Sequence, residues 1–320
     1  MVNQSMRVVL LVVGFLLVPV SACTQAPTPE SVQTPITLPL VSEEGFPRID
    51  GSTSAAPLGA KILCAMMEMP CEWVEFIDGN RYLMPDLTSY SDDFPRFGHQ
   101  GTHAAYINLI EGNTDLILVA RSPSQEEIEL AEFSGVTFDI KPIGLDAFVF
   151  MVNEDNPVHG LSIDEIQGIY TGEITNWQEV GGPPVSITPY QRDDQSGSQQ
   201  LMNSMVMKGV PMVEAPDLVL LKMIAPFYAI SEDPQGIGYS VFYYEENMAP
   251  NEYIKLIAVD GVQPTLDSIK NREYPFTSEV YSVTRADSSP ANLGVRLQEW
   301  LLTQEGQELV TQSGYAPYTD

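Results

Sequence analysis

The sequence predicts an α/β protein with parallel sheets, and two observations carry that prediction. Short apolar runs with the length of buried strands occur at 114–120 and 146–153. Longer segments that read as helices lie between such runs, as at 102–112 and 124–135. Strands that alternate with helices are typical of α/β architecture.

The individual elements follow from local composition. The segment 124–135 carries acidic residues in its first turn, where they favour the helix dipole. Ser162 is the expected N-cap of a short helix at 162–170. Further helices are predicted at 54–69, 196–209 and 292–314, and further strands at 47–50, 185–190 and 236–244.

Composition restricts the class of partner. The chain has 320 residues, with 43 acidic and 15 basic side chains and a formal net charge of −28. Nucleic acid is excluded, because phosphate backbones bind to basic surfaces. A hydrophobic content of 44% is sufficient for a proper core. We expect a soluble monomer outside the cytoplasm.

The N-terminus has the features of an export signal. Arg7 precedes the apolar run 8–18, which is too short for a comfortable membrane span. The following VSAC, 20–23, resembles the lipobox of bacterial lipoprotein signal peptides. We therefore predict a signal peptide at 1–22, a lipidated Cys23 and anchoring to the cell membrane through that lipid; the alternative is an ordinary signal peptide with an accidental Cys.

The next segment reads as a tether. Residues 23–45 contain several prolines and show neither helical nor strand periodicity, so they predict an extended spacer.

Beyond the spacer, export makes a disulfide between Cys64 and Cys71 plausible. On a continuous helix their Cα atoms would lie about 10 Å apart, which is too far to bridge. Pro70 is expected to end that helix; two buried thiols are the alternative.

Three loops share one pattern, in which glycine and hydroxyl residues precede a helix. They are GSTS at 51–54, GT at 101–102 and SGS at 196–198. Helix N-termini offer free N–H groups and a partial positive charge, so they bind anions without lysines. Any one of these loops is also explained as a plain N-cap.

Arg192, just before the third loop, supplies a positive charge. A guanidinium binds phosphate or sulfate through two parallel hydrogen bonds. Asp193 or Asp194 is expected to hold this fork in place; the alternative is an ordinary surface ion pair. An acidic chain is compatible with a local anion site, since surface charges beyond about 10 Å are largely screened.

Together these segments resemble a known family. The stretches RIDGSTSAAPLGAKI, DAFVFMVNEDNPV, IYTGEITNW, YQRDDQSGSQ, GIGYSVF and GYAPY are similar to the phosphate-binding proteins of phosphate-specific ABC importers, in the same order, over roughly residues 46–320. The resemblance implies a two-lobed type II periplasmic-binding-protein fold with a central cleft. It implies lobe I at 46–147 plus 246–320 and lobe II at 148–245, with hinge crossings near 146–153 and 236–242.

The resemblance also implies a ligand set and partners. By motif position the ligand-binding residues are Thr53, Ser54, Thr102, Arg192, Ser196, Gly197 and Ser198, and Asp194 braces the Arg. The family often has an Asp after the strand at 114–120, where this chain has Arg121. Arg121 in the site would favour a more highly charged anion; the alternative is a surface residue.

Catalysis is not expected. HQGTH, 99–103, lacks the Glu that would follow the first His in a zinc protease motif. The SGS loop does not form a nucleophile elbow. We therefore expect no catalytic residue, no metal and no cofactor. The sequence predicts a solute-binding lipoprotein that captures phosphate or a related oxyanion for an ABC permease; the alternative is a surface lipoprotein that uses this fold for anion sensing or adhesion without transport.

Overall fold

The computed structural model describes residues 37–38, 40–41, 45–86 and 98–318. These belong to one compact unit, Ile36–Asp320. The signal peptide predicted at 1–22, the lipidated Cys23 and most of the tether at 23–45 lie outside the described residues. Among the helices that the structure describes, none has both the length and the apolar character needed to cross a membrane.

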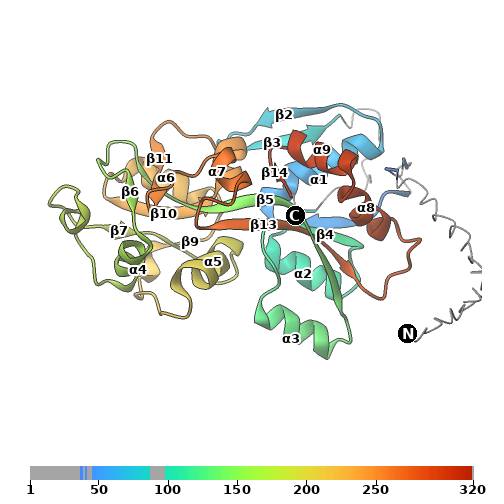
Figure 1. The fold of residues 1–320 in the computed structure, drawn as a ribbon, viewed down its shortest axis with the longest axis horizontal. Helices are drawn as coiled ribbons and strands as arrows, with labels where there is room; N and C mark the ends of the chain where they lie inside the picture. Colours follow the sequence, from blue (N-terminus) through green and yellow to red (C-terminus); the bar gives the residue numbers. More distant parts are fainter. Residues whose placement is uncertain (1–36, 39, 42–44, 87–97, 319–320) are drawn as a thin grey trace, which may run out of the picture. The chain divides into compact units, whose positions relative to one another are not determined.

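The fold is built on one mixed sheet (Figure 1). Its strands run in the order β1 (Ile49–Gly51), β4 (Leu116–Val119), β13 (Thr277–Arg285), β5 (Phe138–Asn153), β10 (Gly236–Val241) and β7 (Thr188–Pro189), and β11 (Ile254–Leu256) and β14 (Ala316–Pro317) also pair with β5. Among these strands, only β1 with β4 and β7 with β10 are parallel. In this sheet the prediction of parallel pairing is correct only at the flanks, because the long strands β5 and β13 run antiparallel to their neighbours. The small pairs of β6 (Gly160–Leu161) with β12 (Ala258–Val259) and of β8 (Gln191–Arg192) with β9 (Val219–Leu220) are also parallel.

Helices and short strand pairs complete the chain. The α-helices are α1 (Ala56–Met66), α2 (Thr102–Ile110), α3 (Gln125–Phe133), α4 (Ile163–Thr171), α5 (Gly197–Leu201), α6 (Ala225–Glu232), α7 (Leu266–Lys270), α8 (Leu293–Leu301) and α9 (Gln304–Gln312). Single turns of other types are η2 (Thr53–Ala55), η3 (Trp177–Val180), η4 (Met202–Met207), η5 (Pro216–Leu218) and η6 (Tyr244–Met248). The small sheets pair β2 (Cys71–Glu75) with β3 (Arg81–Pro85), β6 (Gly160–Leu161) with β12 (Ala258–Val259) and β8 (Gln191–Arg192) with β9 (Val219–Leu220).

Strand β5 joins two groups of elements. Its residues 138–147 pair with β13, and its residues 148–152 pair with β10. We call the elements around the first stretch the first lobe and those around the second stretch the second lobe. Strands β11 and β12, which fall in the range predicted for lobe I, pair instead with the end of β5 and with β6. The pairing thus keeps 254–259 with the second lobe and does not follow the predicted boundary at 246.

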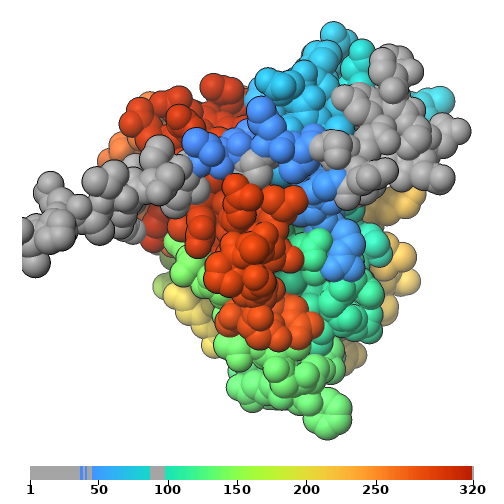
Figure 2. All heavy atoms as spheres, turned by 90° about the vertical axis from the view of Figure 1, so that its right-hand side faces the viewer, coloured from blue at the N-terminus to red at the C-terminus, as the bar shows by residue number. Residues whose placement is uncertain are grey.

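Helix ends follow local signals. Ser162 caps α4 and accepts a hydrogen bond from Glu165 N, as predicted, and Ser124 caps α3 in the same way. The single helix predicted at 292–314 is two helices, because Thr303 caps the N-terminus of α9. On the face in Figure 2, the first described residues, in blue, lie beside these C-terminal helices, in red. Contacts between α1 and α9 agree with that view.

A disulfide links α1 to the β2–β3 hairpin. Cys64 and Cys71 are bonded, with their Cα atoms 6.1 Å apart. Helix α1 ends at Met66, well before Pro70, so the proline is not what ends it. The chain turns through Glu68, whose positive φ of 52° is the left-handed conformation that reverses direction after a helix. Strand β3 then lies against α1.

The core surrounds the long central strand. Phe148 and Phe150 of β5 contact Tyr239 of β10, with ring centroids 5.3 and 6.2 Å apart. Tyr170 of α4 packs against the same Tyr239 ring at 5.6 Å. These side chains are almost fully buried, so they fix the position of β10. They also fix the loop between β7 and α5, which lies next to β10.

Candidate functional site

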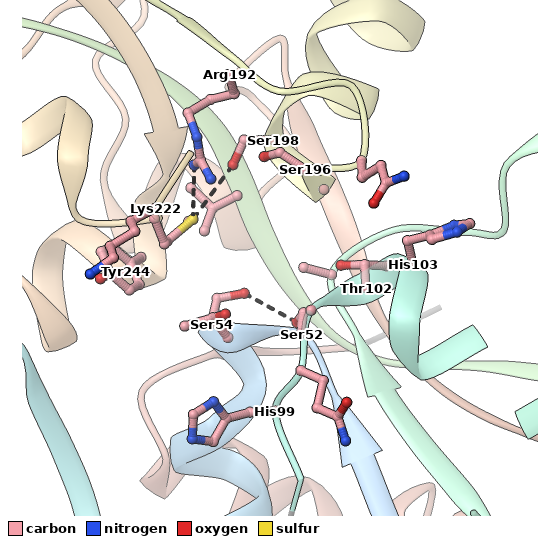
Figure 3. Close-up of a pocket in the computed structure, with 18 of the residues that line it drawn as sticks. Ser52, Ser54, His99, Thr102, His103, Arg192, Ser196, Ser198, Lys222 and Tyr244 are labelled. Carbon is pink, nitrogen blue, oxygen red and sulfur yellow. Dashed lines mark hydrogen bonds between the residues drawn. The ribbon is translucent and has the colours of Figure 1, made fainter. Parts of the chain in front are cut away.

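A pocket of about 490 Å³ lies between the two lobes. Three helix starts line it: the loop before α1, the loop before α2 and the loop before α5. Figure 3 shows Arg192, Ser196 and Ser198 on one side and Ser52, Ser54 and Thr102 on the other. All eight residues predicted to bind ligand line this pocket: Thr53, Ser54, Thr102, Arg121, Arg192, Ser196, Gly197 and Ser198.

The hydroxyl groups at these helix starts are not used as caps. Ser52 and Ser196 occupy N-cap positions, yet neither side chain accepts a capping hydrogen bond. Gly101 is the N-cap of α2, so Thr102 follows with its hydroxyl also uncommitted to capping. Ser124 and Ser162 elsewhere in the chain do cap their helices. The plain N-cap interpretation therefore does not hold for the pocket loops. The Ser52 and Ser54 hydroxyls lie 3.3 Å from each other, and Ser198 Oγ lies 3.8 Å from Met223 Sδ, so these hydroxyls bond within the pocket wall instead.

The lobes touch at the edge of the pocket. A Cβ atom placed on Gly197 of α5 would lie 2.8 Å from Thr102 Oγ1 of α2. That separation is shorter than real Cβ contacts, so a side chain at position 197 would require Thr102 or its helix start to shift. The starts of α2 and α5 are consequently close enough for one small anion to contact both.

Arg192 is buried, with 6% of its surface exposed. Its Nε donates to the Leu220 carbonyl at 2.8 Å, its Nη2 to the Leu221 carbonyl at 3.2 Å and its Nη1 to Met223 Sδ at 3.4 Å. A guanidinium has five N–H donors, so one hydrogen remains on each Nη. A guanidinium can bind an oxyanion through two parallel hydrogen bonds, and these two hydrogens are available for such bonds.

Arg192 stays positively charged, and its hydrogen-bond partners among the described residues do not neutralise that charge. Burial lowers the pKa of Arg192 from its ordinary value, and the nearby charge of Asp193 opposes that shift. The guanidinium stays protonated, because Arg does not lose its proton in proteins. Its described partners are carbonyls and a thioether rather than a carboxylate. An unneutralised buried cation is a strong attraction for an anion.

The predicted brace from Asp194 is not present. The carbonyl of Asp194 accepts from Gln200 Nε2, and Asp194 lines a different pocket beside α5 and η4. Asp193, the other candidate, lines the anion pocket and receives a hydrogen bond from Gln195 N at 3.2 Å. Backbone carbonyls of β9 and of the loop after it hold the Arg192 guanidinium instead. These carbonyls belong to residues 28 and 29 positions after Arg192, so the sequence around Arg192 does not reveal the contact.

Arg121 is committed to a buried ion pair. Its Nη1 and Nη2 donate to Glu127 Oε2 and Oε1, both at 2.8 Å. Glu127 is fully buried, and His103 Nδ1 lies 3.0 Å from its Oε1. Burial alone would raise the pKa of Glu127, but the bonds and charge of Arg121 hold it below its usual value. Arg121 is 7% exposed, so it is not a surface residue. It lines the pocket with its charge balanced by Glu127, and its role as an anion ligand stays a prediction.

Sequence reasoning missed several residues of the pocket. Lys222 and Tyr244 of the second lobe line it, together with Asp78, Asn80, Tyr82 and His99 of the first. The ring of His103 points away from Arg192 in Figure 3, in keeping with its contact to Glu127. Lys222 adds a second cation whose field also lowers the pKa of Asp78, after the hydrogen bonds from Asn80. None of these residues lies in a glycine and hydroxyl motif, so no local signal in the sequence indicated them.

A buried carboxyl group lies where β5 changes partners. Asp146 Oδ1 accepts from Ala147 N at 2.8 Å and from Tyr243 N at 2.9 Å, so it joins β5 to the segment after β10. Its Oδ2 has no hydrogen-bond partner among the residues that the structure describes. Burial raises the pKa of Asp146 to about 7, and the two backbone bonds only partly oppose that shift. The group therefore lies next to both predicted hinge crossings.

The described residues contain no metal-binding cluster, in that no group of three or more His, Cys, Asp or Glu side chains is suitably placed. The chemistry available in the pocket is hydrogen bonding and charge. The lining residues that can donate include Ser and Thr hydroxyls, Arg192 and Lys222, and those that can accept include the carboxylates of Asp78 and Asp193. Such a set suits a small anion that also carries a proton.

Comparison with known proteins agrees with this geometry. The family described as PBP superfamily domain matches residues 87–305. The phosphate-binding protein PstS of Bacillus subtilis is 30% identical over 174 residues, which cover 53% of this chain and 54% of that protein. The match thus spans about half the length of that relative. PstS of Borreliella burgdorferi is 21% identical over 68% of this chain and 77% of its own length.

Solved structures share the fold. A crystal structure of a Clostridium perfringens protein with bound phosphate aligns with a TM-score of 0.63 and 22% identity, over 85% of this chain and 98% of that one. An ABC-type phosphate transport receptor from Vibrio cholerae aligns with a TM-score of 0.61 and 21% identity, over 84% and 99%. The predicted two-lobed α/β fold is confirmed by these matches.

Proposed function

Since the chain belongs to the PBP superfamily, we propose that it is an extracytoplasmic solute-binding protein that captures inorganic phosphate for an ABC importer. The observation that carries the proposal is the state of the donors in the pocket. The hydroxyl groups at the helix starts form no caps, and Arg192 keeps two N–H groups without a described partner. An oxyanion would satisfy both sets at once.

The carboxylates favour phosphate over sulfate. Asp78 and Asp193 line the pocket, and the pKa of Asp78 is held below its usual value by hydrogen bonds from Asn80. An ionised carboxylate accepts a hydrogen bond from hydrogen phosphate but repels sulfate, which has no proton at neutral pH. Asp78 and Asp193 would accept the hydrogen bond from protonated phosphate. In the family that this chain resembles, that acceptor is often an Asp at the position of Arg121.

The contacts available are sufficient for physiological binding. Micromolar affinity corresponds to about −8 kcal/mol. Hydrogen bonds to a charged group contribute about 1.5–3 kcal/mol each. The two free N–H groups of Arg192 and the hydroxyls of Ser54, Thr102 and Ser198 would supply that amount after the ordering cost, without any bond to Arg121.

Binding would hold the lobes together. The anion would contact Thr102 of the first lobe and Ser196 and Arg192 of the second, across the contact between Thr102 and Gly197. Closure removes water from the donors, which strengthens each bond. Release to a permease would then require that the lobes separate, and the hinge would lie where β5 passes from β13 to β10.

The remaining parts of the proposal concern location and partners. Lipidation at Cys23 and a tether to about residue 45 would keep a monomeric binding protein at the membrane, next to the permease subunits. Removal of the signal peptide is checked by mass spectrometry of the purified protein. A mature N-terminus at Cys23 with an added lipid mass is expected, and an unmodified N-terminus at another residue would overturn the anchor.

Calorimetric titration with phosphate and then sulfate, at pH 6 and pH 8, tests the proposed ligand. We expect micromolar or tighter phosphate binding and at least tenfold weaker sulfate binding at both pH values. Arg296 is exposed on α8. Its replacement is therefore the control for substitutions that remove the positive charge of Arg192. If sulfate binds as tightly as phosphate, the carboxylates do not set the preference, and if neither binds, the ligand is a different anion.

A further inference from the structure

The β2–β3 hairpin has few apolar anchors of its own. Trp73, Val74 and Met84 on its strands and Phe76 and Ile77 at its tip are all exposed. A two-stranded hairpin is marginally stable by itself. Packing of β3, with its buried Leu83, on α1 holds one side of the hairpin, and the remaining contacts are at its base and its tip.

At its base the hairpin is tied to the first lobe. The Cys64–Cys71 disulfide joins the start of β2 to α1, and Asp86 N donates to the Pro70 carbonyl at 3.2 Å. Helix α1 follows directly from η2, which carries Thr53 and Ser54. The disulfide thus fixes the hairpin to the same helix whose start lines the anion pocket.

At its tip the hairpin is bonded to the other side of the pocket. The Tyr228 hydroxyl of α6 donates to the Asp78 carbonyl, and the Tyr244 hydroxyl of η6 donates to Asn80 Oδ1. Helix α6 packs on β10 and on the second stretch of β5, so Tyr228 belongs to the second lobe. A Cβ atom on Gly79 would lie 3.2 Å from the Tyr228 hydroxyl oxygen, so the tip is shaped to receive it.

The tip also forms part of the pocket wall. Asp78, Asn80 and Tyr82 line the pocket, and Asn80 is only 4% exposed. The Tyr82 ring stacks on His99 of the first lobe, with centroids 5.7 Å apart. The hairpin therefore spans from one lobe to the other beside the anion.

We propose that the β2–β3 hairpin is a strap that closes the pocket, held to the first lobe by the Cys64–Cys71 disulfide and to the second by Tyr228 and Tyr244. This inference rests on the proposed function, since the strap retains the bound anion. The strap forms bonds that exist only when the lobes are together. It should therefore slow release of the anion and leave its entry unaffected.

The test is the rate of phosphate release from the full-length protein, measured by chasing bound radiolabelled phosphate with unlabelled phosphate. We expect the Tyr228→Phe, Tyr244→Phe double variant to release phosphate about tenfold faster, because two cross-lobe hydrogen bonds are lost. Tyr228→Phe alone should release phosphate severalfold faster with an unchanged association rate, since Tyr228 does not belong to the pocket lining. The Cys64→Ser, Cys71→Ser double variant is expected to do the same. The control is Tyr253→Phe, since Tyr253 is 62% exposed and its hydroxyl has no partner among the described residues.

A second measurement separates the strap from the proposed function. Hydrogen exchange of 71–86 in the phosphate-free protein should become faster in the Tyr double variant, while exchange of β13 should not change. An unchanged release rate in that variant, or weaker binding that comes from slower association alone, would overturn the strap. If wild-type protein binds no phosphate, the proposed function fails, and the exchange of 71–86 alone then decides whether the tip bonds hold the hairpin.

Discussion

Gly197 and Thr102 meet across the pocket so closely that a Cβ atom on Gly197 would lie 2.8 Å from Thr102 Oγ1. One residue begins α5 in the second lobe and the other begins α2 in the first. The contact brings together two helix N-termini whose hydroxyl groups are free of capping bonds. Under the proposed function, this contact would let an acidic chain provide a local site for an anion.

Gly197→Ala is expected to weaken phosphate binding about tenfold, or by about 1.4 kcal/mol. The added methyl group would push the lobes apart at Thr102, so each charge-assisted bond would lengthen. Calorimetry measures the loss, and the melting temperature shows whether the fold is retained. Equal affinity in a folded variant would mean that the two helix starts do not need to approach this closely.

Arg192→Lys is expected to reduce phosphate affinity at least a hundredfold, about 2.7 kcal/mol. Lysine keeps the charge but cannot donate two parallel hydrogen bonds, and it leaves the Leu220 and Leu221 carbonyls without their donors. Arg296→Lys is the matched control at an exposed position. If the Arg192→Lys variant bound phosphate as tightly as the wild type, the fork geometry would not be required.

Glu127→Gln is expected to destabilise the protein by about 3–5 kcal/mol, because it leaves Arg121 buried without its balancing charge. Denaturant unfolding measures the change. Glu126→Gln, at the exposed neighbouring position of α3, should change stability by less than about 0.5 kcal/mol. Equal effects of the two substitutions would contradict a structural role for the pair of Arg121 and Glu127.

Stability should depend on the titration of Asp146. Its pKa is raised to about 7 in the folded protein from an ordinary value of 3.8, so the folded state binds the extra proton between those values. Stability is therefore expected to fall as pH rises from about 4 to 7, with a slope of at most about 1.4 kcal/mol per pH unit. Asp146→Asn should reduce this slope in unfolding measurements at pH 5, 6, 7 and 8. Part of the slope should remain, because burial also raises the pKa of Glu245 to about 7.

The control for that measurement is Asp164→Asn, in the exposed first turn of α4. It should leave the difference in stability between pH 5 and pH 8 as it is in the wild type. If Asp146→Asn and Asp164→Asn have the same pH profile as the unmodified protein, the carboxyl group of Asp146 is not the titrating group.

The sequence was most informative where function depends on local backbone. The loops at 51–54, 101–102 and 196–198 each place glycine and hydroxyl residues at a helix start, and the structure brings all three to one pocket. Several helices and strands were predicted for the same reason, since caps and apolar runs are local features, but β2, β3 and β13 were not. The antiparallel pairing of β5 with β13 was not predicted, because β13 joins the sheet from far along the chain.

Side-chain partners were the least predictable part of the site. The Arg192 fork bonds to carbonyls of residues 220 and 221 rather than to the adjacent Asp194, and Arg121 reaches Glu127 in the next helix. Both arrangements depend on how loops fold back. The hairpin tip that carries Asp78 has no anion-binding pattern in its sequence, so only its contact with Tyr228 reveals its place at the pocket.

A crystal structure of the protein with phosphate is the most direct test of the central claim. We predict one phosphate in the pocket between the lobes, with two oxygens bound by the Nη atoms of Arg192 and others bound by Ser54, Thr102 and Ser198. A pocket that stays empty at saturating phosphate, or a phosphate bound elsewhere with Arg192 uninvolved, would contradict the account.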